Sequence, residues 1–231
     1  MNSSPDALTP AEQQAFSQSV ENVKQASIVH LGAHTGDTYP IAFYGNLHRG
    51  IDRVVQAAVD RDVGVACHTG CSFCCSARVA ISAPEVFLIA DAIRLRPESE
   101  IEVVVKRLRQ HADMNANKTD WKQRTPCPFL DNDLCTIYSL RPVGCRKAHS
   151  LDLAACQAGA DVLPQSLDIV LAAEALTLGT SEAYRASGLD MAHYEFVAAL
   201  WCALVDSESK DRWLSGERVF DSDSGAEQLG T

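Results

Sequence analysis

The chain has 231 residues, 46% of them hydrophobic, which suits a globular protein with a substantial core. Its 30 acidic and 20 basic residues give a formal net charge of −10, and this disfavours a general nucleic-acid or anionic-membrane surface. The longest apolar run, around residues 169–173, is far too short to cross a bilayer.

The chain contains nine cysteines, and their role depends on the compartment in which the protein works. Residues 1–14 are polar and show neither a basic leader nor an apolar run, so we expect no secretory signal. A reducing, cytoplasmic location is therefore predicted, and there cysteines serve as ligands rather than as disulfides.

The N-terminal part of the chain is predicted to be helical after a short flexible leader, residues 1–10. A helix is expected to begin after Thr9 and Pro10, since Thr caps helices and Pro fits the first helical position. Residues 54–63 continue the helical spacing. Residues 28–37 look faintly like a strand that enters a glycine nucleotide loop, but a Gly-x3-Gly pair with no parallel sheet after it is more often a turn.

Two further helices are predicted after the first cysteine cluster. Ser82 and Glu85 have the spacing of a capping box, with apolar residues following at helical intervals. Residues 100–114 form a second, charged amphipathic pattern, and Pro97 is a natural break between the two. Residues 125–158 are rich in turn residues and are expected to form a cysteine-bearing loop.

The C-terminal third shows two apolar helical patterns, residues 167–178 and 191–205, and then a polar segment, 207–231, that is typical of a flexible tail. Strand patterns are few and short. The sequence therefore predicts a mainly α fold, with a single helical domain over residues 11–206 that holds a cysteine-rich metal-binding region at 64–156.

Eight of the nine cysteines lie between residues 67 and 156, and thiolates bind zinc, copper(I) or iron–sulfur centres in preference to hard cations. The candidate metal ligands are Cys67, Cys71, Cys74, Cys75, Cys127, Cys135, Cys145 and Cys156. In a helix, residues 67–75 would place their four thiols on one face. In a loop, Gly70 would supply the backbone freedom to wrap a metal.

Other residues near these thiols allow more than one interpretation. Cys74 and Cys75 are adjacent, and successive side chains diverge, so we expect either two nearby centres or one centre with a structural or redox-active neighbour. His68 and His149 are candidate substitute ligands, although a single His beside such a cluster is more often a supporting or surface residue. Cys202 lies in an apolar helical pattern and is expected to be a core residue.

The spacing favours an iron–sulfur centre, such as a 4Fe–4S cluster, with zinc as the alternative. Only Cys71 and Cys74 have the Cys-x2-Cys spacing of structural zinc sites. Arg141 and Arg146 flank Cys145, where their positive charge could offset the negative charge of a thiolate centre, and we interpret both as cofactor-binding residues. A solvated basic turn is the competing interpretation.

Four motifs occur together in one order: Cys67-x3-Cys71-x2-Cys74-Cys75, Cys127-Pro-Phe-Leu130, Cys135-Thr-Ile-Tyr138 and Arg141-Pro142-x2-Cys145-Arg146. In this order, over residues 64–150, the chain closely resembles the CxxxCxxCC cysteine-cluster proteins, called YkgJ-type and labelled zinc- or iron-chelating. The resemblance implies a metal-binding protein of largely unassigned function. A related cysteine pattern in flagellin lysine methylases, which are thought to carry an iron–sulfur cluster and use S-adenosylmethionine, gives an enzymatic precedent by analogy.

Three functions are compatible with these patterns. The first is a metal-binding protein whose centre has a structural or redox role, with an unknown protein or small molecule as partner. The second is a methyltransferase-like enzyme that uses S-adenosylmethionine. The spacing of residues 67–74 matches the radical type of such enzymes, but no alternation of strands and helices follows it. The third, conventional Cys/His or acid–base catalysis, ranks last because no such signature is present.

Overall fold

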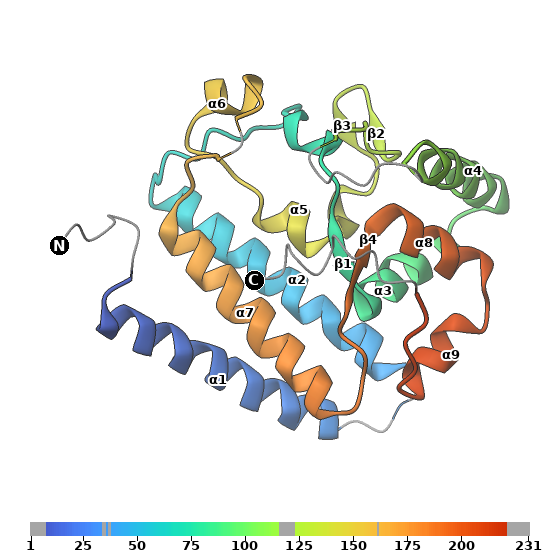
Figure 1. Cartoon of the computed structure of the whole chain (residues 1–231), viewed down its shortest axis with the longest axis horizontal. Helices are drawn as coiled ribbons and strands as arrows, with labels where there is room; N and C mark the ends of the chain where they lie inside the picture. The colour runs from blue at the N-terminus through green and yellow to red at the C-terminus, as the bar shows by residue number, and fades with distance from the viewer. Residues whose placement is uncertain (1–7, 34–35, 37, 116–122, 161, 221–231) are drawn as a thin grey trace.

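The computed structural model describes residues 8–33, 36, 38–115, 123–160 and 162–220. It is mainly helical, as the sequence predicts (Figure 1). The α-helices are α1 (Pro10–Ala33), α2 (Tyr39–Asp60), α3 (Ala83–Arg94), α4 (Glu98–Asn115), α5 (Val143–Lys147), α6 (Leu153–Gln157), α7 (Leu167–Ala186), α8 (Phe196–Val205) and α9 (Ser209–Leu214). Two 3-10 helices are η1 (Phe73–Ser76) and η2 (Tyr138–Leu140), and the short strands are β1 (Ala80–Ser82), β2 (Leu130–Asp131), β3 (Leu134–Cys135) and β4 (His193–Glu195).

The three longest helices lie side by side, with α7 between α1 and α2 (Figure 1). Gly179 of α7 permits the close approach of α1. A Cβ at this position would lie 2.5 Å from the carbonyl oxygen of Val20 and 2.7 Å from Cβ of Val23, both on α1. Within the described residues, none of the helices is sufficiently long and apolar to cross a membrane.

Gly179→Ala is expected to lower the free energy of unfolding by about 1–3 kcal/mol, because the new methyl group would force α1 away from α7. Gly32→Ala is the matched control. A Cβ on this helical glycine of α1 would meet nothing within 4 Å, so the change should be neutral or stabilising by up to about 1 kcal/mol. Urea unfolding of the two variants measures the difference. Equal stabilities would contradict the close packing of α1 on α7.

The hydrophobic core lies where α2, α3, α7 and α8 meet. Ile51, Phe87, Tyr184, Leu200 and Trp213 are fully buried there. Antiparallel pairing of β1 with β4, in the register Ile81↔Tyr194, joins segments that are more than a hundred residues apart in the sequence. The strands of the described residues form two antiparallel pairs, β1–β4 and β2–β3.

The helix predicted after residues 82–85 is present as α3, but the predicted capping box is wrong. The Ser82 side chain makes no capping hydrogen bond and instead donates from Oγ to the Tyr44 hydroxyl, 2.9 Å away. The Glu85 carboxylate accepts a hydrogen bond from the backbone N–H of Val143 at 2.6 Å. Both side chains are buried, and long-range partners therefore replace the local ones that the spacing predicted.

Two other predicted boundaries also differ from the structure. Residues 28–33 belong to α1, so the strand considered for residues 28–37 is wrong there, while residues 34, 35 and 37 lie outside the described residues. The helix predicted over 191–205 begins only at Phe196, because residues 193–195 form β4 instead.

The flexible tail was predicted to begin at residue 207, but the chain is packed against the core as far as residue 220. Residues 207–220 include α9, and the Trp213 side chain is fully buried, with its Nε1 donating to the carbonyl oxygen of Asp190 at 2.9 Å. Phe220 is also buried, and its ring packs against Phe87. Large aromatic side chains anchor this otherwise polar segment to the core. Residues 1–7 and 221–231 of the predicted leader and tail lie outside the described residues.

Candidate metal centre

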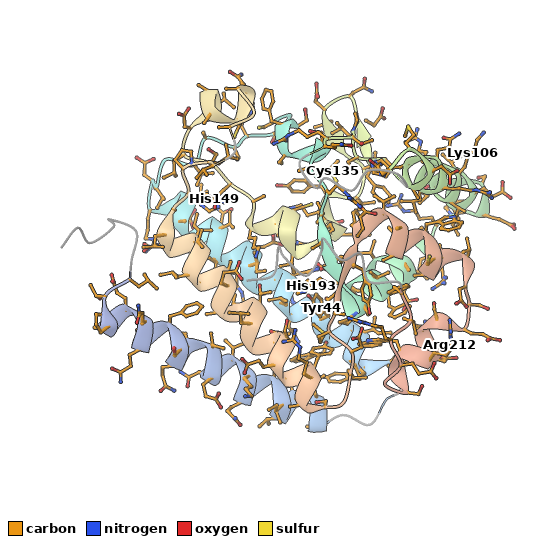
Figure 2. The ribbon with its side chains drawn as sticks, viewed as in Figure 1. Tyr44, Lys106, Cys135, His149, His193 and Arg212 are labelled. Atoms are coloured by element: carbon orange, nitrogen blue, oxygen red, sulfur yellow. The ribbon has the colours of Figure 1, made fainter. Side chains whose placement is uncertain are left out.

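The eight candidate thiols lie on short segments: the 67–75 loop with η1, the residues that precede β2, strand β3, α5 and α6 (Figure 1). Figure 2 shows Cys135 in this region, with Tyr44 and His193 nearer the centre of the view. Within the described residues, none of the nine cysteines forms a disulfide bond. Residues 125–158, which were predicted to form a loop, lack a long helix, but they contain the β2–β3 hairpin, η2, α5 and α6, so the prediction is only partly right.

Four thiols, which we call the inner thiols, are those of Cys75, Cys127, Cys135 and Cys145. The backbone N–H of Cys127 donates to the carbonyl oxygen of Cys75 at 2.7 Å, which joins the two segments directly. Leu130 donates its N–H to the carbonyl oxygen of Cys127 at 3.0 Å and pairs with Cys135 across the β2–β3 hairpin. The first three inner thiols are therefore on neighbouring pieces of backbone.

The fourth inner thiol, Cys145, is carried by α5, which packs against β1. Gly144 allows this approach, because a Cβ there would lie only 3.2 Å from Cγ1 of Val79. Burial raises the pKa of the Cys145 thiol, and the charges of Cys127, Cys74 and Cys135 raise it further. Burial also raises the pKa of Cys127 to about 11, with a further contribution from Cys135. The inner thiols therefore lie close enough to influence one another electrostatically.

A second set, which we call the outer thiols, consists of Cys67, Cys71, Cys74 and Cys156. Cys67 and Cys74 are exposed. Burial raises the pKa of Cys67, and the charges of the other three outer thiols add to this effect. Gly70, at φ +84°, makes the turn between Cys67 and Cys71 possible, as the sequence predicts.

Cys74 and Cys75 connect the two sets. Their thiols share a hydrogen bond, which raises the pKa of Cys74 and lowers that of Cys75. The expectation that these successive side chains diverge is wrong, because the 3-10 turn of η1 brings the two sulfur atoms together.

Within the described residues, no three or more His, Cys, Asp or Glu side chains are placed as a ready-made metal site. A metal bound here would be held by these cysteines as thiolates, so its binding would displace their protons. The donor set itself, eight thiols, is suited to a soft metal.

Comparison with known proteins supports this chemistry. Residues 66–162 match the CxxCxxCC family, described as "Putative zinc- or iron-chelating domain". The predicted resemblance is confirmed over this segment, which contains all eight candidate thiols and leaves Cys202 outside. No curated protein and no solved structure gives a significant match to the chain. The match supports binding of zinc or iron and does not distinguish between them.

Two arginines of the matched segment (residues 66–162), Arg141 and Arg146, form salt bridges with Asp52 of α2. Arg141 donates to Oδ1 at 3.0 Å and Arg146 to Oδ2 at 2.5 Å. Arg146 is 4% exposed and also donates to the carbonyl oxygens of Ser139 and Arg141. These contacts attach the segment to the helical body. The cofactor-binding role of both arginines stays a prediction.

His68 and His149 of the matched segment are the histidines predicted as possible metal ligands in place of a cysteine. His149 is buried, and its Nε2 accepts the backbone N–H of Ser166 at 2.9 Å. Nδ1 must then carry the proton and donate to the carbonyl oxygen of Lys147, 2.8 Å away. Both ring nitrogens of His149 are thus engaged in holding the chain between α5 and α7. His68 is exposed, and its Nδ1 lies 2.9 Å from the carbonyl oxygen of Thr69.

The sequence did not reveal the buried pair of Glu85 and His48, which positions α5. Glu85 is 1% exposed, and its Oε1 lies 2.6 Å from Nε2 of His48 and 2.6 Å from the backbone nitrogen of Val143, the first residue of α5. A carboxylate at the start of a helix satisfies a backbone donor that has no partner within the helix. Glu85 thereby fixes the short helix that carries Cys145.

Proposed function

We propose that the protein binds a metal centre through the inner thiols, with an iron–sulfur cluster favoured over zinc. The observation that carries the proposal is that backbone hydrogen bonds join the segments of Cys75, Cys127 and Cys135, while the charges of Cys127 and Cys135 raise the pKa of the buried Cys145 thiol on α5. Four cysteine thiolates are the usual ligands of an iron–sulfur cluster. The spread of these ligands along the sequence differs from the paired spacing of structural zinc sites.

The centre would serve either as a structural link or as a redox group. A structural centre would join η1, the β2–β3 hairpin and α5, none of which is longer than five residues in any one helix or strand. Binding free energy would then contribute directly to folding. An iron–sulfur cluster would in addition supply one-electron transfer. Either role requires reduced thiols, so the proposal includes a reducing compartment such as the cytoplasm.

Purification without oxygen tests the proposal. The protein is expected to be brown, to contain iron and acid-labile sulfide in comparable amounts, and to bleach in air. Elemental analysis, a sulfide assay and an absorption spectrum measure these properties. Colourless protein with stoichiometric zinc and no sulfide would contradict the iron–sulfur version and favour zinc, and protein with neither metal would contradict a metal centre altogether.

The enzymatic alternative makes a separate prediction that the same preparation can test. A methyltransferase-like protein must bind S-adenosylmethionine, so isothermal titration would show saturable binding. Redox activity of the centre without such binding would favour a redox or structural protein.

A further inference from the structure

Four arginines gather around a single carboxylate, that of Asp52, where α2 packs against α5. Arg49 and Arg53 belong to α2, whereas Arg141 and Arg146 lie just before and within α5. We propose that Arg49 and Arg53 form a binding site for the phosphate group of a small molecule. The site uses no cysteine, so the inference stands apart from the proposed metal centre.

The charges around Asp52 leave an excess of positive charge. Both oxygens of this carboxylate are occupied, Oδ1 by Arg141 at 3.0 Å and Oδ2 by Arg146 at 2.5 Å. Among the residues that the structure describes, neither Arg49 nor Arg53 has a carboxylate within salt-bridge distance. Four guanidinium groups therefore share one carboxylate, although the whole chain has a formal net charge of −10.

The two arginines of α2 are placed to act together. They are four residues apart, so both side chains lie on the same face of the helix. With Asp52 they line an open hollow of about 340 Å³, which is in the range of small-molecule sites, about 300–1,000 Å³. Both arginines are exposed, and a ligand can therefore reach them without any movement of the fold.

Most of the hydrogen-bond donors of these two side chains remain for a ligand. Nη2 of Arg49 donates to Oδ1 of Asn46 at 2.5 Å, and Nε of Arg53 donates to the carbonyl oxygen of Arg49 at 3.3 Å. These local contacts hold both side chains along α2. A guanidinium group carries five N–H donors, and within the described part of the chain each of the two uses a single nitrogen.

A phosphate group fits this arrangement better than a carboxylate. Two guanidinium groups without a carboxylate carry two positive charges, and a phosphate monoester at neutral pH carries a charge of about −1.5 to −2 on three acceptor oxygens. The planar fork of arginine binds phosphate through two parallel hydrogen bonds. A carboxylate supplies one charge, and the carboxylate of Asp52 already occupies the other two arginines.

Equilibrium dialysis of the full chain, purified without oxygen, against radiolabelled adenosine monophosphate tests the site. About 0.15 M salt screens the weaker attraction of the general surface. We expect saturable binding of one molecule per chain. Arg49→Gln and Arg53→Gln should each weaken it by about tenfold or more, because each removes a charge-assisted contact.

Arg107→Gln is the matched control, since it makes the same charge change at an exposed arginine of α4 that has no salt bridge among the described residues. It should bind as the wild type does. Unlabelled inorganic phosphate should compete with the labelled ligand, whereas acetate and adenosine should not. Phosphate that competes as well as unlabelled adenosine monophosphate would identify free phosphate as a sufficient ligand, and weaker competition would favour a phosphate ester.

Three outcomes overturn the phosphate site. The first is the absence of saturable binding, and the second is an equal loss in Arg107→Gln and Arg53→Gln, which would indicate general charge attraction. The third is competition by acetate or adenosine that equals competition by phosphate. The metal content of the wild type is measured separately, so a missing metal centre and a missing phosphate site are distinguishable results.

Discussion

Glu85→Ala is expected to lower the free energy of unfolding by about 2–6 kcal/mol, because it leaves two buried polar groups without their hydrogen-bond partner, at about 1–3 kcal/mol each. The change removes the acceptor of both His48 Nε2 and the N–H of Val143, each 2.6 Å from the carboxylate in a site where Glu85 is 1% exposed. It would also leave α5 without its anchor. Denaturant unfolding measures the loss, and metal content measures the effect on the centre that α5 supports.

Two further variants make the Glu85 result interpretable. Glu85→Gln keeps an oxygen that can accept the Val143 N–H, so it should retain more stability and more metal than Glu85→Ala. Glu102→Ala removes an exposed carboxylate from α4 and should change stability by no more than about 0.5 kcal/mol. A loss in Glu85→Ala no larger than in Glu102→Ala would show that this buried carboxylate does not anchor α5.

Cys145→Ser is expected to lose the inner centre and, with it, a large part of the stability of the cysteine region. Serine is nearly the same size, so the packing cost is small, but its hydroxyl is a poor ligand for a soft metal. A ligand present at a thousand times its dissociation constant stabilises the folded state by about 4 kcal/mol, and the variant should lose an amount of that order. Thermal unfolding without oxygen, with and without a chelator, measures it.

The chelator distinguishes lost ligation from lost packing. It should destabilise the wild type strongly and Cys145→Ser hardly at all, because the variant has no inner metal to lose. Equal sensitivity of both proteins to the chelator would contradict a ligand role for Cys145.

Much of the helical fold could be predicted from the sequence, because helical periodicity is a local property. The pattern of residues 100–114 became α4, and Pro97 separates it from α3 as expected. Strand β4 could not be predicted in this way. Its three residues lie within the segment 191–205 that was predicted to be helical, and their extended conformation depends on pairing with β1, far away in the sequence.

The candidate ligands were predictable for a different reason, since thiol chemistry depends on residue type and needs no fold. The way in which the segments that carry them are joined was not predictable. It depends on hydrogen bonds such as Cys127 to Cys75 and Ala66 to Ser150, which join segments far apart in the sequence. The role of Glu85 was missed for the same reason, because its spacing from Ser82 matched a local motif while its real partners lie on α2 and α5.

The most direct test of the inner metal centre is the metal content of two variants purified side by side without oxygen. Cys145→Ser removes an inner thiol, and Cys202→Ala removes a thiol of α8 outside the matched segment, at a packing cost of about 1 kcal/mol. Iron, zinc and acid-labile sulfide per chain are measured in each. We predict wild-type values in Cys202→Ala and loss of the inner centre in Cys145→Ser. Equal metal content in the two variants would contradict the inner thiols as its ligands.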